Sequence, residues 1–117
     1  VNQTIYNNLN SDNPVFENVT IKTSLSDNIS VSGNVSSKNE TYNNLTINIT
    51  RTLPAVSNNI GVIYMFKKKD TSVYTVNILP YSGDNIDGDT TGYLLELEDE
   101  FVQLMGINST TWAVIAE

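Results

Sequence analysis

The sequence contains no cysteine and no histidine, and each absence excludes a class of chemistry. Without cysteine there is no disulfide, so thiol usage says nothing about the redox compartment. Without histidine the chain lacks the usual general base at neutral pH and the commonest zinc ligand. The sequence also lacks a Gly-rich phosphate loop and a Ser-His-Asp set. We therefore expect no enzymatic activity and no bound cofactor.

Positive charge is scarce, with 6 Lys and Arg residues against 13 Asp and Glu residues and a formal net charge of −7. Proteins that bind nucleic acids present basic surfaces to the phosphates, so nucleic acid is not an expected partner. Anionic membrane surfaces are disfavoured for the same reason. Long hydrophobic runs are also missing, so we expect no membrane insertion. The chain begins at Val1 without a charged and apolar leader, and we expect a mature or excised fragment.

Charged residues make up only 16% of the chain, and Asn, Ser and Thr fill the deficit. A length of 117 residues predicts one domain, and 39% hydrophobic residues are too few for a large core but too many for disorder. Apolar residues alternate with polar ones, which places them on one face of a strand. Short strands separated by Gly, Asn and Asp turns are typical of an all-β sandwich or barrel. The clearest alternating segments are 19–21, 29–31, 45–49 and 73–78.

The first forty residues contain more Asn and Ser and shorter apolar runs than the rest. Segments such as 24–26 and 29–36 resemble the short, repetitive strands of viral fibre shafts, which usually wrap around a threefold axis. The alternative is that they form edge strands of one larger sandwich. We expect residues 1–41 to be a shaft-like or strand-exchanged trimerisation segment. Residues 42–117 would form a small antiparallel β-sandwich or jelly-roll-like head.

Three aspartates lie within six residues, and closely spaced oxygen ligands suit calcium. Their spacing departs from the Asp-x-Asp-x-Asp-Gly loop, and no Glu lies at the closing position. We favour a turn instead, in which Gly83 and Gly88 adopt positive φ and Ile86 fills the core. The three residues of the calcium alternative are Asp84, Asp87 and Asp89.

Eight Asn-x-Ser/Thr triplets occur, and each would be a glycan acceptor in a eukaryotic secreted protein. The alternative is that Asn-rich strands produce such triplets, because Asn-apolar-Thr places both polar side chains on one strand face. We favour this second interpretation. The triplets begin at Asn2, Asn18, Asn28, Asn34, Asn39, Asn44, Asn48 and Asn108.

Three glutamates, Glu96, Glu98 and Glu100, would share one face if their segment were a continuous strand. Paired carboxylates can hydrolyse glycosides, but alternating carboxylates on an exposed strand more often form a solvated face that discourages edge pairing. We expect one lysine of the run 67–69 to pair with this acidic strand and the others to be solvated. A contact with an acidic polysaccharide is the alternative.

Trp112 is the only tryptophan, and it alternates with Val114 in a predicted strand. We expect it in the core rather than on a sugar-stacking surface. The segment 61–66 has apolar residues on both faces, so we expect it to be buried on both sides, which requires a second sheet or another subunit. The same choice between core and sugar stacking applies to Tyr64, Phe66, Tyr74, Tyr81, Tyr93 and Phe101.

The order of strands and turns in residues 53–117 resembles a small β domain of phage tail fibres and of fibre or spike proteins of large DNA viruses. The motifs that carry the resemblance are a Lys-Lys-x-Asp turn, a Thr-Val-x-Ile strand, a Gly-Asp-x-Ile-Asp-Gly turn and a Trp-x-Val-Ile strand. In this sequence they lie at 67–70, 75–78, 83–88 and 112–115.

This resemblance implies a homotrimer on the virion surface that binds a host-surface glycan or protein. Tyr74 and Lys69 depart from the pattern, so we carry over no ligand contact. A cellular surface adhesin or S-layer-type domain would share the acidic, Asn-rich and cysteine-free composition. A fibre-borne polysaccharide depolymerase is the third alternative. The sequence leaves the host, the ligand and its contact residues open.

Overall fold

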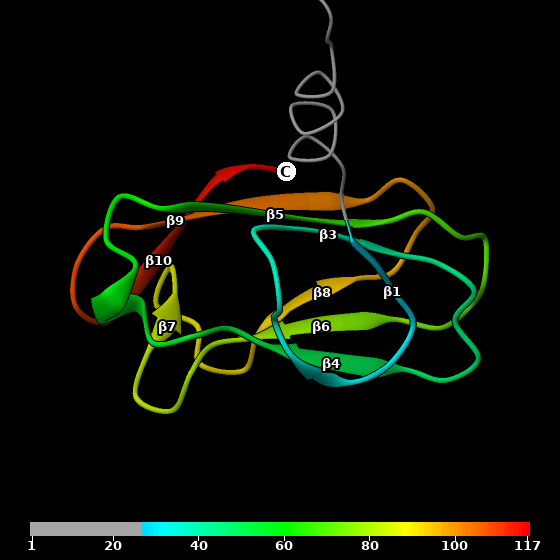
Figure 1. Cartoon of the computed structure of the whole chain (residues 1–117), viewed down its shortest axis with the longest axis horizontal. Coiled ribbons are helices and arrows are strands. Elements are labelled where there is room, and N and C mark those ends of the chain that lie inside the picture. The colour runs from blue at the N-terminus through cyan, green and yellow to red at the C-terminus, as the bar shows by residue number, and fades with distance from the viewer. Residues whose placement is uncertain (1–26) are drawn as a thin grey trace, which may run out of the picture.

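The structure is a computed structural model that describes residues 27–117. These residues form short strands and one turn of 3-10 helix, arranged as two facing sheets (Figure 1). The fold is all-β, as the alternation of apolar and polar residues predicts. Within this range, no helix has the length and apolar character needed to cross a membrane. The elements are β1 (Asp27–Ile29), β2 (Gly33–Asn34), β3 (Asn39–Tyr42), β4 (Ile49–Thr52), η1 (Val56–Asn58), β5 (Ile63–Lys68), β6 (Val76–Leu79), β7 (Asn85–Ile86), β8 (Tyr93–Leu95), β9 (Phe101–Gly106) and β10 (Thr111–Ala116).

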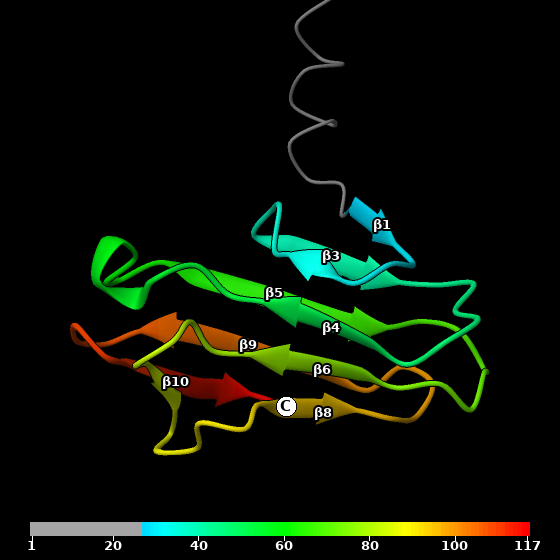
Figure 2. The same cartoon turned by 90° about the horizontal axis from the view of Figure 1, so that it is seen from below.

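The first half of the described chain passes back and forth between the two sheets, and successive passes stack in parallel. One sheet has the order β1-β3-β5-β9-β10-β7, and the other has the order β2-β4-β6-β8. Strands β1, β3 and β5 are parallel neighbours, as are β2, β4 and β6. Each pair of consecutive strands therefore makes one coil of a short solenoid (Figure 2). Strands β8, β9 and β10 then complete the two sheets with antiparallel pairs.

The prediction of an antiparallel architecture is wrong for this first half, because both sheets are mixed. Antiparallel neighbours can be joined by a tight hairpin, whereas parallel neighbours need a crossover connection. Here the crossover is a strand of the opposite sheet. Alternation within a strand indicates which face is buried, but it carries no information on the direction of the neighbouring strand. The direction is set by contacts between residues that are distant in sequence.

Two strands begin later than the alternation predicts. Strand β4 begins at Ile49, and the preceding segment 45–48 is a loop in which Ile47 is exposed. Strand β6 begins at Val76, and Val73 is exposed as well. These loops are held by a side chain rather than by a strand ladder, since the Asn48 Oδ1 accepts a hydrogen bond from the Thr75 N–H at 3.0 Å.

The proposed boundary between residues 41 and 42 falls at the end of β3. In the described part of segment 1–41, β1 and β3 belong to the six-stranded sheet and β2 to the four-stranded sheet. The expected strand at 19–21 lies outside the described residues. A separate shaft-like segment therefore stays a prediction.

The core lies between the sheets and is filled by alternate residues of each strand. In β5, Phe66 points inward and is fully buried, whereas Ile63 on the opposite face is 47% exposed. Among residues 27–117, therefore, other strands cover only one face of β5. The buried apolar residues are Tyr42, Leu45, Ile49, Leu53, Val56, Tyr64, Phe66, Val76, Ile78, Ile86, Leu95, Val102, Leu104 and Trp112.

A buried ion pair connects the two sheets between β3 and β4. Glu40 of β3 and Arg51 of β4 lie 2.9 Å apart, and neither side chain is more than 5% exposed. The Tyr42 hydroxyl donates to the same carboxylate at 2.8 Å. Three polar side chains thus replace apolar packing inside the coil formed by β3 and β4.

Candidate functional site

Among the aromatic residues that the sequence offered as sugar-stacking candidates, two are clearly exposed. Tyr81 is 51% exposed and Tyr74 is 36% exposed. By contrast, Trp112 is fully buried, and its ring makes an edge-to-face contact with Tyr64 at a centroid distance of 5.3 Å. A sugar-stacking surface in the described part of the chain is therefore best sought around Tyr81 or Tyr74.

Tyr81 lies between two surface hollows, which makes it the stronger candidate. One hollow, of about 240 Å³, is lined by Asn34, Thr52 and Pro54 among others. The second, of about 550 Å³, contains Pro80, Ser82 and Thr90. Tyr81 and Thr52 line both hollows, so the two form one continuous surface. We call these two hollows and Tyr81 the Tyr81 groove.

The turn that carries Tyr81 is fixed by hydrogen bonds. The Asp84 N–H donates to the Tyr81 carbonyl at 2.8 Å, and Gly83 between them has a φ of 93°. The buried Asp84 carboxylate accepts a hydrogen bond from the Val56 N–H of η1 at 2.9 Å. Gly83 allows the turn because it has no Cβ to clash at positive φ. The ring of Tyr81 is therefore presented from an anchored turn.

The chemistry of the Tyr81 groove suits a neutral, hydroxylated ligand. An exposed aromatic face packs against the C–H face of a pyranose ring, and the surrounding hydroxyl and amide groups can exchange hydrogen bonds with its hydroxyls. Among the described residues that line the two hollows, Asp84 is the one charged residue, and its carboxylate already binds a backbone amide. This part of the chain therefore offers the groove no basic side chain for an anionic ligand.

The three aspartates of the calcium alternative do not converge on a common point. The Asp87 carboxylate accepts from the Val114 N–H, and Asp89 accepts from both the backbone and the hydroxyl of Thr91. Asp84 is bound to η1. Residues 27–117 contain no group of three acidic, histidine or cysteine side chains arranged to hold a metal ion. Each carboxylate instead stabilises a nearby backbone segment.

The segment 83–88 contains a tight turn at Asp87 and Gly88, and Gly83 also has a positive φ. Asp87 and Gly88 have φ values of 50° and 91°, and the residues on either side, Ile86 and Asp89, exchange two backbone hydrogen bonds. Positive φ at both central positions is typical of a two-residue hairpin turn. Ile86 is buried beside β10, where it pairs in register with Trp112.

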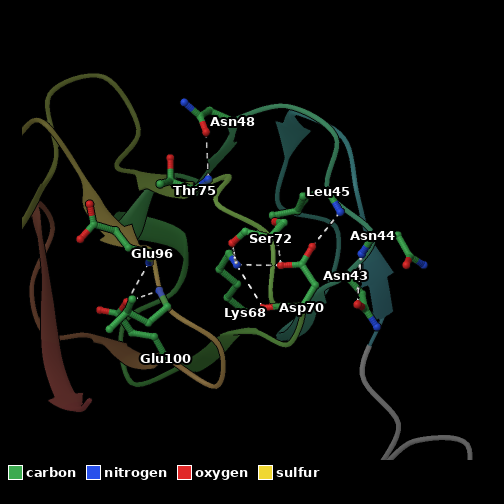
Figure 3. Close-up of polar contacts among 11 residues, drawn as sticks. Asn43, Asn44, Leu45, Asn48, Lys68, Asp70, Ser72, Thr75, Glu96 and Glu100 are labelled. Atoms are coloured by element: carbon green, nitrogen blue, oxygen red, sulfur yellow. Dashed lines mark hydrogen bonds and ion pairs between the residues drawn. The ribbon is translucent and has the colours of Figure 1, made fainter.

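The three glutamates do not lie on one continuous strand, so the condition for a shared acidic face is not met. Strand β8 ends at Leu95, and the Glu100 carboxylate turns back to accept hydrogen bonds from the backbone N–H groups of Glu96 and Leu97 (Figure 3). Asp99, with a φ of 66°, completes this turn and pairs with Lys69 at 2.9 Å. The carboxylate of Glu100 is therefore occupied with closing the turn, and the three glutamates share no strand face.

The prediction that two of the three lysines are solvated is also wrong for one of them. The Lys68 side chain is fully buried, and its ammonium donates to the Asp70 carboxylate at 2.7 Å and to the Ser72 carbonyl at 2.9 Å (Figure 3). Burial alone would raise the pKa of Asp70, but hydrogen bonds from Lys68, Leu45 and Ser72 hold its pKa below the usual value. This cluster joins the end of β5 to the two loops 43–48 and 69–75.

The described Asn-x-Ser/Thr triplets lie at the surface. Their asparagines are exposed, except for Asn39, which is partly buried, and Asn2 and Asn18 lie outside the described residues. The reverse triplet, Ser/Thr-x-Asn, also occurs eight times in the sequence. Glycosylation would favour only one direction, whereas polar residues that alternate along strands favour both equally. The equal numbers in both directions favour a chain rich in Asn, Ser and Thr as the source of the triplets.

The exposure of Tyr81 could have been predicted from the turn residues on either side of it, although they form no functional motif. Tyr81 lies in the run Pro80-Tyr81-Ser82-Gly83, directly after a predicted strand. An aromatic residue in a Pro/Gly turn has no strand neighbours to cover it, so exposure is the expected outcome. The buried pair of Glu40 and Arg51 left no comparable signal.

No protein-family model matches the sequence. No curated protein matches it either.

Proposed function

We propose that this chain is a structural and attachment module of a fibre or spike on a virion surface, and that it binds a neutral host-surface glycan in the Tyr81 groove. The observation that carries the glycan contact is the half-exposed Tyr81 ring between two hollows edged by hydroxyl and amide groups. The virion setting is supported by the strand and turn order that resembles fibre domains. The stacked parallel coils also suit a fibre, because a solenoid grows along one direction.

The module acts as a homotrimer in this proposal. Its outer sheet face carries Ile63, Met65 and Met105 on adjacent strands, with Ile63 and Met105 paired in register. Ile115 at the end of β10 is exposed as well. Copies of the chain that pack through this face would bury it and would place several Tyr81 grooves on one particle. Each groove is shallow, so adhesion to a cell depends on several weak contacts acting together.

The direct test measures the binding of the intact protein to an array of neutral oligosaccharides. Removing a stacking ring typically costs about 0.5–1.5 kcal/mol, which corresponds to a loss of about two- to tenfold in affinity per site. Tyr81→Ala should weaken this binding by that factor per site, and Tyr81→Phe should keep most of it because the ring remains. Tyr74→Ala is the matched control, since it removes an exposed tyrosine from a different loop.

Circular dichroism must show that Tyr81→Ala is folded before its binding is interpreted. Equal binding by the wild-type protein and Tyr81→Ala would contradict the role of the groove. Release of reducing sugar from a host polysaccharide by the wild-type protein would favour the depolymerase alternative.

A further inference from the structure

Strand β8 is the last strand of the four-stranded sheet, and among residues 27–117 it has a neighbouring strand on one side only (Figure 2). The Leu53 N–H after β4 donates to the Leu79 carbonyl of β6, so the odd-numbered residues of β6 direct their backbone groups to β4. The even-numbered residues of β6 face β8 instead, where Tyr93 and Leu95 lie in register with them. Because successive residues of a strand alternate in direction, the N–H and carbonyl of Leu94 point to the open side.

This edge of the sheet is uncovered within the described part of the chain. Strand β8 contains neither a charged residue nor a proline, the residue types that commonly protect a sheet edge. The outer edge of β10 in the other sheet differs, because it is paired with β7 and, beyond β7, the Asp87 carboxylate accepts a hydrogen bond from the Val114 N–H. The backbone of Leu94 has no such partner among residues 27–117.

A surface hollow of about 550 Å³ begins where β8 ends. Its lining includes Val73 and Leu97, which are 85% and 72% exposed, together with Thr75, which directly precedes β6. The side chain of Leu94 is exposed as well. The open edge of β8 therefore leads into an apolar surface that the rest of the described chain leaves uncovered.

The charge of this hollow is negative. Glu96 and Glu98 line it, and neither carboxylate forms an ion pair or a hydrogen bond within residues 27–117 (Figure 3). The nearest basic residues in the sequence that reach the surface, Lys67 and Lys69, pair with Asp99 instead. Two carboxylates without a counter-charge beside an exposed apolar surface match a partner that carries basic and apolar side chains together.

We propose that the open edge of β8 and this hollow form a docking surface for an extended segment of another protein in which basic and apolar residues alternate. The segment pairs with the Leu94 N–H and carbonyl as one further strand of the sheet. The methylene stems of its Lys or Arg side chains pack on Leu94 and Leu97, and their charged ends meet Glu96 and Glu98. A second copy of this chain suits the surface less well, because its net charge of −7 is repelled there. The proposal does not depend on the glycan contact.

Fluorescence anisotropy of the full chain with a labelled, end-capped peptide of alternating Val and Lys tests the role of charge. This peptide should bind, and a peptide of alternating Val and Glu should not. Glu96→Gln should weaken the binding about two- to fivefold, the contribution of one exposed ion pair. Asp27→Asn is the matched control, because it removes an exposed carboxylate from β1 in the other sheet and should leave the affinity unchanged.

Methylation of the peptide backbone tests the strand pairing without altering the protein. A strand with a single neighbour uses the N–H groups of only one of its edges, which belong to alternate residues. Of two peptides that are N-methylated at all Val or at all Lys residues, one should lose at least about tenfold in affinity because it loses several hydrogen bonds. The other should bind like the unmodified peptide.

Four results would overturn the proposal. Failure of the Val-Lys peptide to bind at millimolar concentration would exclude the partner class. Equal binding of the two methylated peptides would exclude strand pairing, and equal affinities of Glu96→Gln and Asp27→Asn would exclude the role of the acidic hollow. Self-association of the wild-type chain that the Val-Lys peptide abolishes would assign the edge of β8 to a second copy instead.

Discussion

Replacing Arg51 by Met should destabilise the protein more than most single substitutions. The guanidinium of Arg51 donates two hydrogen bonds to Glu40, from Nε to Oε1 at 3.1 Å and from Nη2 to Oε2 at 2.9 Å. The same carboxylate accepts hydrogen bonds from the Tyr42 hydroxyl and from the backbone and hydroxyl of Ser36. Methionine fills similar volume but provides no positive charge, so the buried carboxylate would keep only its neutral donors.

The magnitude follows from the burial of both partners. Removing one member of a buried pair costs about 3–5 kcal/mol, because an uncompensated charge remains inside. The neutral donors from Tyr42 and Ser36 still stabilise the carboxylate, so we expect about 3 kcal/mol for Arg51→Met. A domain of this size typically has a free energy of unfolding of about 5–15 kcal/mol. In the double variant Arg51→Met with Glu40→Gln the charge is gone while an acceptor remains, so part of the loss should return.

The loss should also depend on pH. Burial raises the pKa of Glu40, but the hydrogen bonds from Arg51, Ser36 and Tyr42 outweigh it and hold the pKa below the usual value. A carboxyl group with a lowered pKa in the folded state contributes stability above its unfolded pKa of about 4.3, and this contribution is lost as the pH falls through the folded pKa. The unfolded state is the same in both proteins, so the difference between wild type and Arg51→Met should be full at pH 7 and shrink as the pH falls through the pKa of Glu40 in the folded variant, which lies above that of the wild type because the hydrogen bonds from Arg51 are gone.

Urea unfolding of the full chain, followed by tryptophan fluorescence at pH 7 and again under acidic conditions, measures both effects. The double variant serves as the internal control for lost packing, since it removes the same guanidinium. A free energy of unfolding for Arg51→Met within about 1 kcal/mol of the wild-type value at pH 7 would refute the reasoning. So would a double variant that is no more stable than the single variant.

Three further substitutions test the turn, the core and the assembly. Gly88→Val should lower the melting temperature, because a side chain at a φ of 91° adds about 1 kcal/mol or more of strain. Gly88→Asn should lower it less, since Asn tolerates positive φ. Equal melting curves for the wild type and Gly88→Val would contradict the turn. Trp112→Ala should lower the free energy of unfolding by about 3–5 kcal/mol. Trp112→Phe should lower it less, because the buried indole N–H has no hydrogen-bond partner among the described residues. The fluorescence of the wild type should be blue-shifted and shielded from iodide, and a freely quenched signal would contradict burial. Light scattering should give the mass of three chains for the wild type and a lower mass for Ile63→Lys. Val73→Lys, in an exposed loop, is the control and should keep the wild-type mass. A folded wild-type monomer at micromolar concentration would exclude the trimer.

The sequence predicts the all-β class because the alternation of side chains is a local property. The orientation of β10 illustrates this point, since Trp112 faces the core and Ala113 does not. The same rule misplaces residues 45–48, which continue the alternation of β4 but form a loop. Apolar residues in that loop are spaced as in a strand, but only Leu45 is buried. Whether such a segment joins a sheet depends on the neighbouring strand, which the local pattern does not contain.

The pairing of the buried charges could not be predicted from local patterns. Alternation places Glu40 on the same strand face as Tyr42, but it does not say which side chain Glu40 meets across the core. Its partner Arg51 is eleven residues away and belongs to the other sheet. A charged residue in a strand normally indicates the solvent side, because burying it without a partner is costly. The exception arises only after the coil has brought the two strands face to face.

The solenoid itself was hidden because its coils differ in length. In the six-stranded sheet Asp27 is in register with Glu40, and Glu40 is in register with Phe66, so the offset grows from 13 to 26 residues. A repeat is recognised in a sequence by a fixed period, and this increase removes the period. The additional residues extend the loops at the ends of the sheets rather than the strands.

The lengthened coil is also what creates the candidate site. Its extra residues include η1, and the Val56 N–H of η1 holds the Asp84 carboxylate that anchors the turn carrying Tyr81. Without that insertion the turn after β6 would lose its anchor, while the paired strands below it would keep their registers. Loops positioned by a rigid scaffold carry function in many folds, because they vary without disturbing the core. The irregular coil length that conceals the fold in the sequence is therefore the same feature that builds the Tyr81 groove on the structure.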